Sequence, residues 1–134
     1  VVLSCFKQLF RHKDAMVNFY TLEDTARFYA AVMGLWQHYQ QVLSLAILPY
    51  HYETLVEDTE TQAQSLLEHA GLDWRPEVLE FHRIKRNRQV RTPSYQGVSE
   101  PVYNRAVGGW KHYETQLEPV LPDLQPFIDA FGYQ

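Results

Sequence analysis

The chain has 134 residues, 46% of them hydrophobic and 14% aromatic, so it can bury the core of one domain or of part of a larger one. That composition excludes a wholly disordered chain, and the single cysteine excludes an internal disulfide framework. The formal net charge of −4 argues against a dedicated nucleic-acid binder, because such proteins usually have a basic balance. The sequence has no run near the roughly 18 apolar residues that span a bilayer and no signal peptide, so we expect a cytoplasmic protein.

Two helices are predicted in the first third of the chain. Apolar residues at helical spacing predict a helix over residues 1–13, followed by a loop over 14–20. The strongest helix runs over about residues 22–43, and Thr21 with Asp24 resembles a capping box at its start. Its apolar stripe, expected to face the core, consists of Leu22, Ala26, Tyr29, Val32, Met33, Trp36, Tyr39 and Leu43.

Residues 45–52 (LAILPYHY) are too short for a helix and are apolar and then aromatic, which predicts a buried or edge strand. A single strand cannot satisfy its own backbone groups, and this sequence offers no obvious partner strands. The chain also starts at Val1 without an initiator Met. We therefore expect it to be a piece of a longer protein.

Further helices are predicted in the rest of the chain. Thr59 with Gln62 resembles a second capping box, and Gly71 suits the left-handed position after a helix. Pro76 suits the first turn of a short helix. The predicted helices run over residues 58–70, 76–81, 103–117 and 122–131.

Residues 83–91 hold five of the twelve basic residues, and the following residues 92–101 contain two prolines and a glycine and are predicted to form a loop. Hydroxyls, backbone N–H groups and a helix start near Tyr103 suit a phosphate, although a solvated basic loop also explains the run. The six histidines lack metal-site spacing, so we expect no metal ion.

Four segments carry a more specific pattern. They are Val1–Phe6 (VVLSCF), Tyr52–Asp58 (YETLVED), Ala70–Trp74 (AGLDW), and the stretch from Arg91-Thr92-Pro93-Ser94 through Pro101-Val102-Tyr103 to Tyr113. In this order they resemble the later half of sulfotransferases that use 3′-phosphoadenylyl sulfate (PAPS). The resemblance covers essentially the whole chain. It is closest to bacterial enzymes associated with tetratricopeptide repeats and to tyrosylprotein sulfotransferases.

The resemblance implies the α/β, P-loop-like sulfotransferase fold for the complete domain, of which residues 1–134 are the C-terminal part. This part is expected to be mainly α-helical with one or two strands. The implied function is transfer of a sulfuryl group from PAPS to an acceptor that the sequence does not identify. No catalytic residue is assigned, because the family's phosphosulfate loop and usual catalytic base would lie before Val1. We therefore expect no sulfuryl transfer by this chain alone.

The same resemblance implies a set of nucleotide-binding residues. Ser4 is expected to donate to the 3′-phosphate of PAPS or adenosine 3′,5′-bisphosphate, and Tyr52 to pack near adenine. Gly109 stands where the family usually carries Arg or Lys, so Arg105 or Lys111 is expected to supply that charge. The residues expected to close over the nucleotide are Thr92, Ser94, Tyr95 and Val98.

Two other interpretations stay open. The chain could be a non-catalytic module that binds phosphate or nucleic acid through Arg83–Arg91, although its net negative charge disfavours nucleic acid. It could also be an interaction domain that kept the fold and lost the chemistry. The unpaired strand and the apolar face of the helix over 22–43 further predict that two copies associate as a homodimer.

Overall fold

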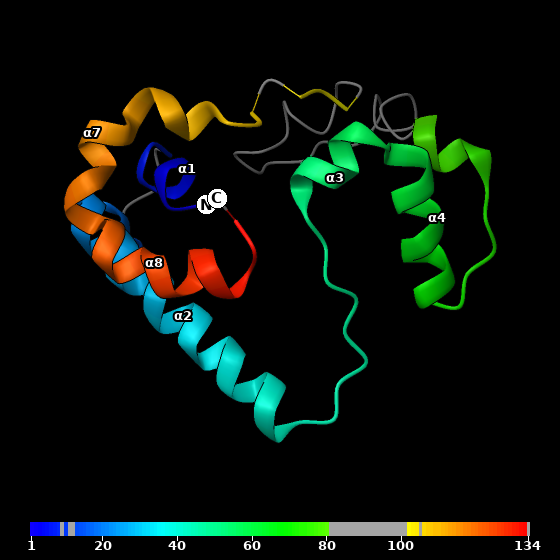
Figure 1. The fold of residues 1–134 in the computed structure, drawn as a ribbon, viewed down its shortest axis with the longest axis horizontal. Helices are drawn as coiled ribbons and strands as arrows, with labels where there is room; N and C mark the ends of the chain where they lie inside the picture. The colour runs from blue at the N-terminus through cyan, green and yellow to red at the C-terminus, as the bar shows by residue number, and fades with distance from the viewer. Residues whose placement is uncertain (9, 11–12, 81–101, 105, 134) are drawn as a thin grey trace. The chain divides into compact units, whose positions relative to one another are not determined.

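The structure is a computed structural model that describes residues 1–8, 10, 13–80, 102–104 and 106–133. The chain divides into two compact units, one made of Val1–Leu45 with Trp110–Gln134 and the other of Ala46–Gly109. All regular elements of the described residues are helical, and none of these residues forms a strand (Figure 1). The mainly helical character expected from the sequence is therefore confirmed.

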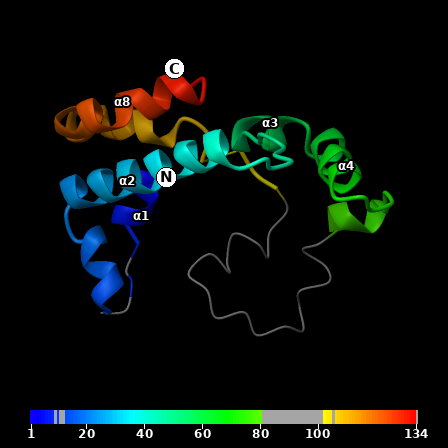
Figure 2. The ribbon, with the colours of Figure 1, turned by 90° about the horizontal axis from the view of Figure 1, so that it is seen from below.

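The first unit is organised around one long helix. Helices α1 and α8 both pack against α2, as Figure 2 shows. The elements in chain order are α1 (Val2–Phe6), the 3-10 helix η1 (Asp14–Phe19), α2 (Leu22–Val42), the 3-10 helix η4 (Gly109–Tyr113), α7 (Glu114–Leu117), the 3-10 helix η5 (Glu118–Val120) and α8 (Leu121–Ala130).

The start of α2 is capped as the sequence predicts. The backbone N–H of Asp24 donates to Thr21 Oγ1 at 3.0 Å, and Thr21 Oγ1 donates to Asp24 Oδ2 at 2.7 Å. Arg27 Nη2 lies 2.6 Å from Asp24 Oδ1. The hydrogen bonds from Arg27 and Thr21 lower the pKa of Asp24, so its contribution to stability is lost only as the pH falls through that lowered pKa.

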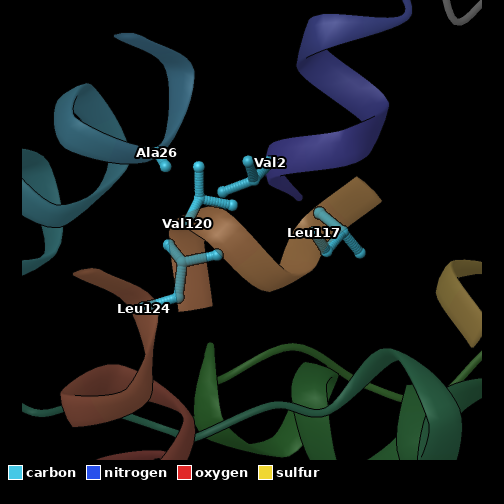
Figure 3. Close-up of a cluster of buried hydrophobic side chains, with 5 residues drawn as sticks. All are labelled: Val2, Ala26, Leu117, Val120 and Leu124. Carbon is cyan, nitrogen blue, oxygen red and sulfur yellow. The ribbon is translucent and has the colours of Figure 1, made fainter. Parts of the chain in front are cut away.

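The core of the first unit is small and lies where α1, α2 and the C-terminal helices meet. Figure 3 shows its buried side chains, Val2, Ala26, Leu117, Val120 and Leu124. Leu22 and Tyr29 of α2 pack against this cluster, which confirms the N-terminal part of the predicted stripe. The prediction is wrong for its C-terminal part, where Tyr39 and Leu43 are 43% and 48% exposed. Helical spacing identifies an apolar face but not how far along the helix a neighbour covers it.

The second unit contains α3 (Tyr52–Glu57), α4 (Thr59–His69) and the 3-10 helix η2 (Pro76–Glu80). The strand predicted over residues 45–52 is wrong: residues 44–51 have no regular structure, and Tyr52 begins α3. A strand needs a neighbour with which to exchange hydrogen bonds, and the described residues supply none. The short helix predicted from Pro76 is present as η2.

Helix α4 is capped by a side chain at its N-terminus and by backbone hydrogen bonds at its C-terminus. Its N-cap is Asp58, which accepts from the Thr61 N–H at 3.2 Å, so the predicted box of Thr59 with Gln62 is wrong. Thr59 Oγ1 instead donates to the carbonyl of Leu55 at 2.8 Å. Gly71 has a φ of +69° and follows the helix as predicted. The N–H of Gly71 donates to the carbonyl of Glu68, and the N–H of Leu72 donates to the carbonyl of Leu67. These two bonds form a Schellman motif.

Replacing two glycines by alanine should have effects of opposite sign. Gly71→Ala is expected to lower the free energy of unfolding by about 1 kcal/mol, because an L-residue is strained at positive φ. Gly34→Ala, inside α2, is expected to raise it by about 0.5–1 kcal/mol. Alanine favours helix, and among the described residues no atom other than the adjoining residues and backbone of α2 lies within 4 Å of the added Cβ. Urea unfolding followed by circular dichroism measures both. Destabilisation by Gly34→Ala would contradict the open surroundings of that position.

The remaining predicted elements differ in their bounds. The helix predicted over residues 1–13 ends at Phe6, and the predicted loop at 14–20 contains η1. The helix predicted over 103–117 begins only at residue 109 and starts as a 3-10 helix. The helix predicted over 122–131 is confirmed as α8. The basic run at 83–91 lies outside the described residues.

Candidate functional site

Helix α1 presents Ser4 to solvent because Val2 anchors the opposite face. Val2 is 7% exposed and belongs to the core cluster. Each helical residue turns the chain by about 100°, so Ser4 lies about 200° around the axis from Val2. Ser4 is exposed accordingly. Its hydroxyl is accessible to a ligand, as the expected role at a 3′-phosphate requires.

Lys7 lies one helical turn after Ser4, and the sequence analysis did not select it. Its Nζ donates to the hydroxyl of Tyr113 at 2.9 Å and lies 4.6 Å from the centre of that ring. Tyr113 is partly buried against the core cluster. The contact joins the residue that directly follows the first resembling segment to the last residue of the fourth segment. The spacing of Ser4 and Lys7 by three residues was a signal for a shared face, but the partnership with Tyr113 was not visible in the sequence.

Tyr52 makes a similar connection within the second unit. It is the first residue of α3, is 41% exposed, and donates from its hydroxyl to the carbonyl oxygen of Tyr103 at 3.2 Å. Tyr52 belongs to the second resembling segment and Tyr103 to the fourth. The bond joins residues 51 positions apart in the sequence, so the second and fourth segments meet in the second unit. The exposed ring surface leaves room for contact with a flat ligand.

Buried polar atoms lie close to Tyr52 in the sequence. The hydroxyl of Tyr50 and Oε2 of Glu53 are shielded from solvent and have no hydrogen-bond partner among the described residues. A buried polar atom without a partner is costly, so both atoms are candidates for contacts with a ligand or with other parts of the chain. Sequence reasoning did not identify either of them.

Lys111 lies on η4 and is exposed, with its Nζ 6.0 Å from the centre of the Trp110 ring. Trp110 is itself 42% exposed. Ser4 and Lys111 belong to the first unit and Tyr52 to the second, so each is placed within its own unit. The other expected nucleotide-binding residues, Thr92, Ser94, Tyr95, Val98 and Arg105, lie outside the described residues.

No group of three or more His, Cys, Asp or Glu side chains in the described part of the chain is arranged to hold a metal ion. Likewise, no helix in the described ranges is long and apolar enough to cross a membrane.

Comparison with known proteins decides the family. The model of the sulfotransferase family matches residues 1–76, more than half of the chain. The chain belongs to the sulfotransferase family. The resemblance noted in the sequence is thereby confirmed at the level of the family. The α/β fold that this sulfotransferase family implies is not seen in the described residues, which are helical.

A curated relative extends the similarity beyond residue 76. An uncharacterized protein of Aquifex aeolicus (strain VF5) is 29% identical over 126 residues, which is 93% of this sulfotransferase chain. The chain spans only 16% of the length of that relative. No solved structure shows significant similarity to the chain.

Proposed function

We propose that this sulfotransferase chain, as the C-terminal part of its domain, binds the adenosine 3′,5′-bisphosphate portion of PAPS while a sulfuryl group is moved to an acceptor. The hydrogen bond from Tyr52 to Tyr103 carries the proposal, because it brings together two of the segments expected to wall the nucleotide. The exposed hydroxyl of Ser4 on α1 supports it. Sulfuryl transfer resembles phosphoryl transfer, in which positioning and charge stabilisation supply most of the acceleration.

Each side chain has a distinct task in this proposal. Ser4 donates a hydrogen bond to the 3′-phosphate and so orients the nucleotide. The ring of Tyr52 packs on adenine, and its bond to the backbone of Tyr103 holds the ring in position. A positioned aromatic ring loses little conformational entropy when a base stacks on it. These groups bind the leaving nucleotide, and none of them is assigned a chemical step.

Tyr52→Ala is expected to weaken the binding of adenosine 3′,5′-bisphosphate by about 1–3 kcal/mol, roughly 5- to 150-fold, because stacking on the base is lost. Tyr52→Phe keeps the ring and removes only the bond to the Tyr103 carbonyl, so its effect should be smaller, about threefold. Isothermal titration calorimetry with the 134-residue chain measures both affinities.

Tyr133→Ala is the matched control, because Tyr133 is 44% exposed and lies outside the four resembling segments. It should leave the affinity unchanged. Equal affinities for the wild-type chain and Tyr52→Ala would remove Tyr52 from the nucleotide site. A wild-type chain that binds no bisphosphate would contradict the proposed function itself.

We also propose that two copies of the chain associate through α2. Five apolar side chains follow one another at steps of four and three residues along this helix and are 39–58% exposed. We name them the α2 seam: Phe28, Val32, Leu35, Tyr39 and Val42. Alternating steps of four and three are the spacing of a coiled-coil interface, in which identical helices pack against each other. Residues 28–42 contain no Asp, Glu, Lys or Arg, so no charge opposes the pairing.

A further inference from the structure

The ammonium group of Lys7 has a defined contact but no acidic partner among the described residues. The ion pair of the described residues joins Arg27 and Asp24, and Lys7 contacts the hydroxyl of Tyr113 instead. An ammonium group has three N–H donors, so the bond to Tyr113 leaves two for another acceptor. Lys7 itself is exposed. The group is therefore a cation that is available to an anionic ligand.

Tyr113 restricts where this cation lies. The Tyr113 ring packs against the core cluster and places its hydroxyl 2.9 Å from Lys7 Nζ. A free lysine side chain loses rotamer entropy when it is fixed. Because the contact with Tyr113 already orders the side chain, an anion that binds there meets part of that cost in advance.

Ser4 and Lys7 lie on the same side of α1. Residues three apart on a helix have Cβ atoms about 5–6 Å apart, and both residues are exposed. The core anchor Val2 lies on the other side of the helix. A hydroxyl and an ammonium group at this separation can donate to different oxygens of one phosphate group.

We propose that Lys7, together with Ser4, binds the 3′-phosphate of the nucleotide and determines the preference for 3′-phosphorylated adenosine nucleotides. This inference rests on the proposed function, since it names a further residue of the same site. It assigns to Lys7 a charge that the sequence alone attributed to Arg105 or Lys111. Lys111 lies over the Trp110 ring at 6.0 Å, whereas Lys7 follows Ser4 by one helical turn.

The test compares two ligands that differ only in the 3′-phosphate, adenosine 3′,5′-bisphosphate and adenosine 5′-monophosphate, by titration calorimetry of the full chain. The ratio of their affinities isolates the 3′-phosphate from adenine and from the 5′-phosphate. Lys7→Met is expected to lower this ratio about tenfold by weakening the bisphosphate alone. Lys7→Arg, which keeps the charge, should retain most of the ratio. Lys13→Met, with the same loss of charge at another exposed position, should leave it unchanged.

Tyr113→Phe provides a second variant that keeps the charge and the packed ring. It removes the hydroxyl that orders Lys7, so the ratio should fall about two- to threefold. Inorganic phosphate, titrated as a third ligand, should bind wild-type and Lys7→Met chains far more weakly than the bisphosphate binds the wild type.

The outcomes separate this inference from the proposed function. If the wild-type chain binds neither nucleotide, the proposed function fails and Lys7 loses its role with it. If the wild type prefers the bisphosphate and Lys7→Met keeps the full preference, only the role of Lys7 is overturned. A ratio that falls in Lys111→Met but not in Lys7→Met would also overturn it and would return the charge to Lys111.

Discussion

Replacing Leu117 by alanine is expected to lower the free energy of unfolding by about 2–5 kcal/mol. Leu117 is 7% exposed and belongs to a core cluster of five residues, so few neighbours can shift to fill the space that the smaller side chain leaves. Small domains have a total stability of roughly 5–15 kcal/mol. The single change should therefore remove a large fraction of the stability of the unit.

Leu45→Ala is the matched control for this experiment. It makes the same chemical change in the same unit, but Leu45 is 47% exposed and should cost less than about 0.5 kcal/mol. Urea unfolding followed by far-ultraviolet circular dichroism compares the two variants. Equal destabilisation by Leu117→Ala and Leu45→Ala would mean that the described cluster is not the core of the unit.

Features that depend on nearby residues could be predicted from the sequence. The cap of α2 needs only Thr21 and Asp24, which are three residues apart. The Asp24 N–H donates to Thr21 Oγ1 as the predicted box requires, and the Asp24 carboxylate accepts from the Thr21 hydroxyl. Gly71 has the predicted left-handed backbone, because a helix end needs a residue without a Cβ penalty at that position. Local spacing also identified α2 and α8. These elements are set by residues within one or two turns of one another.

Features that depend on distant residues could not be predicted. The apolar residues at 45–52 satisfy the pattern of a strand, but that pattern does not reveal whether a partner strand lies beside it. The prediction for the C-terminal part of the α2 stripe failed for the same reason, because periodicity does not show which neighbours cover a face. At the start of α4, Asp58 and Thr59 are adjacent candidates for the cap, and the sequence alone favoured the wrong one.

The candidate site was predicted through resemblance rather than through local pattern. The order of the segments identified Ser4 and Tyr52, whereas their spacing alone would not have distinguished them from other exposed residues. The contact of Lys7 with Tyr113 joins residues 106 positions apart, and that of Tyr52 with Tyr103 joins residues 51 apart. Pairs at such separations leave no periodic signal in a single sequence, so these contacts required the structure.

Introducing a charge into the α2 seam is expected to halve the mass of the protein in solution. The wild-type chain is expected to have the mass of two chains by light scattering at micromolar concentration, and Leu35→Glu the mass of one chain. Leu35 is the central residue of the seam and is 50% exposed, so the substitution is tolerated by a single copy. At a paired helix it would place two carboxylates in an apolar interface, which costs several kcal/mol per buried ion.

Leu72→Glu separates the effect of the seam from a general gain in solubility. Leu72 lies in the other unit and is 59% exposed, so this variant gains the same charge away from α2 and should keep the mass of two chains. Circular dichroism should show equal helix content in all three proteins, because Leu35 does not belong to the buried core cluster. A wild-type chain with the mass of one copy would contradict the pairing. A Leu35→Glu chain that still has the mass of two copies would place the contact on another surface. The reason is that a carboxylate at the centre of the seam interrupts its apolar surface.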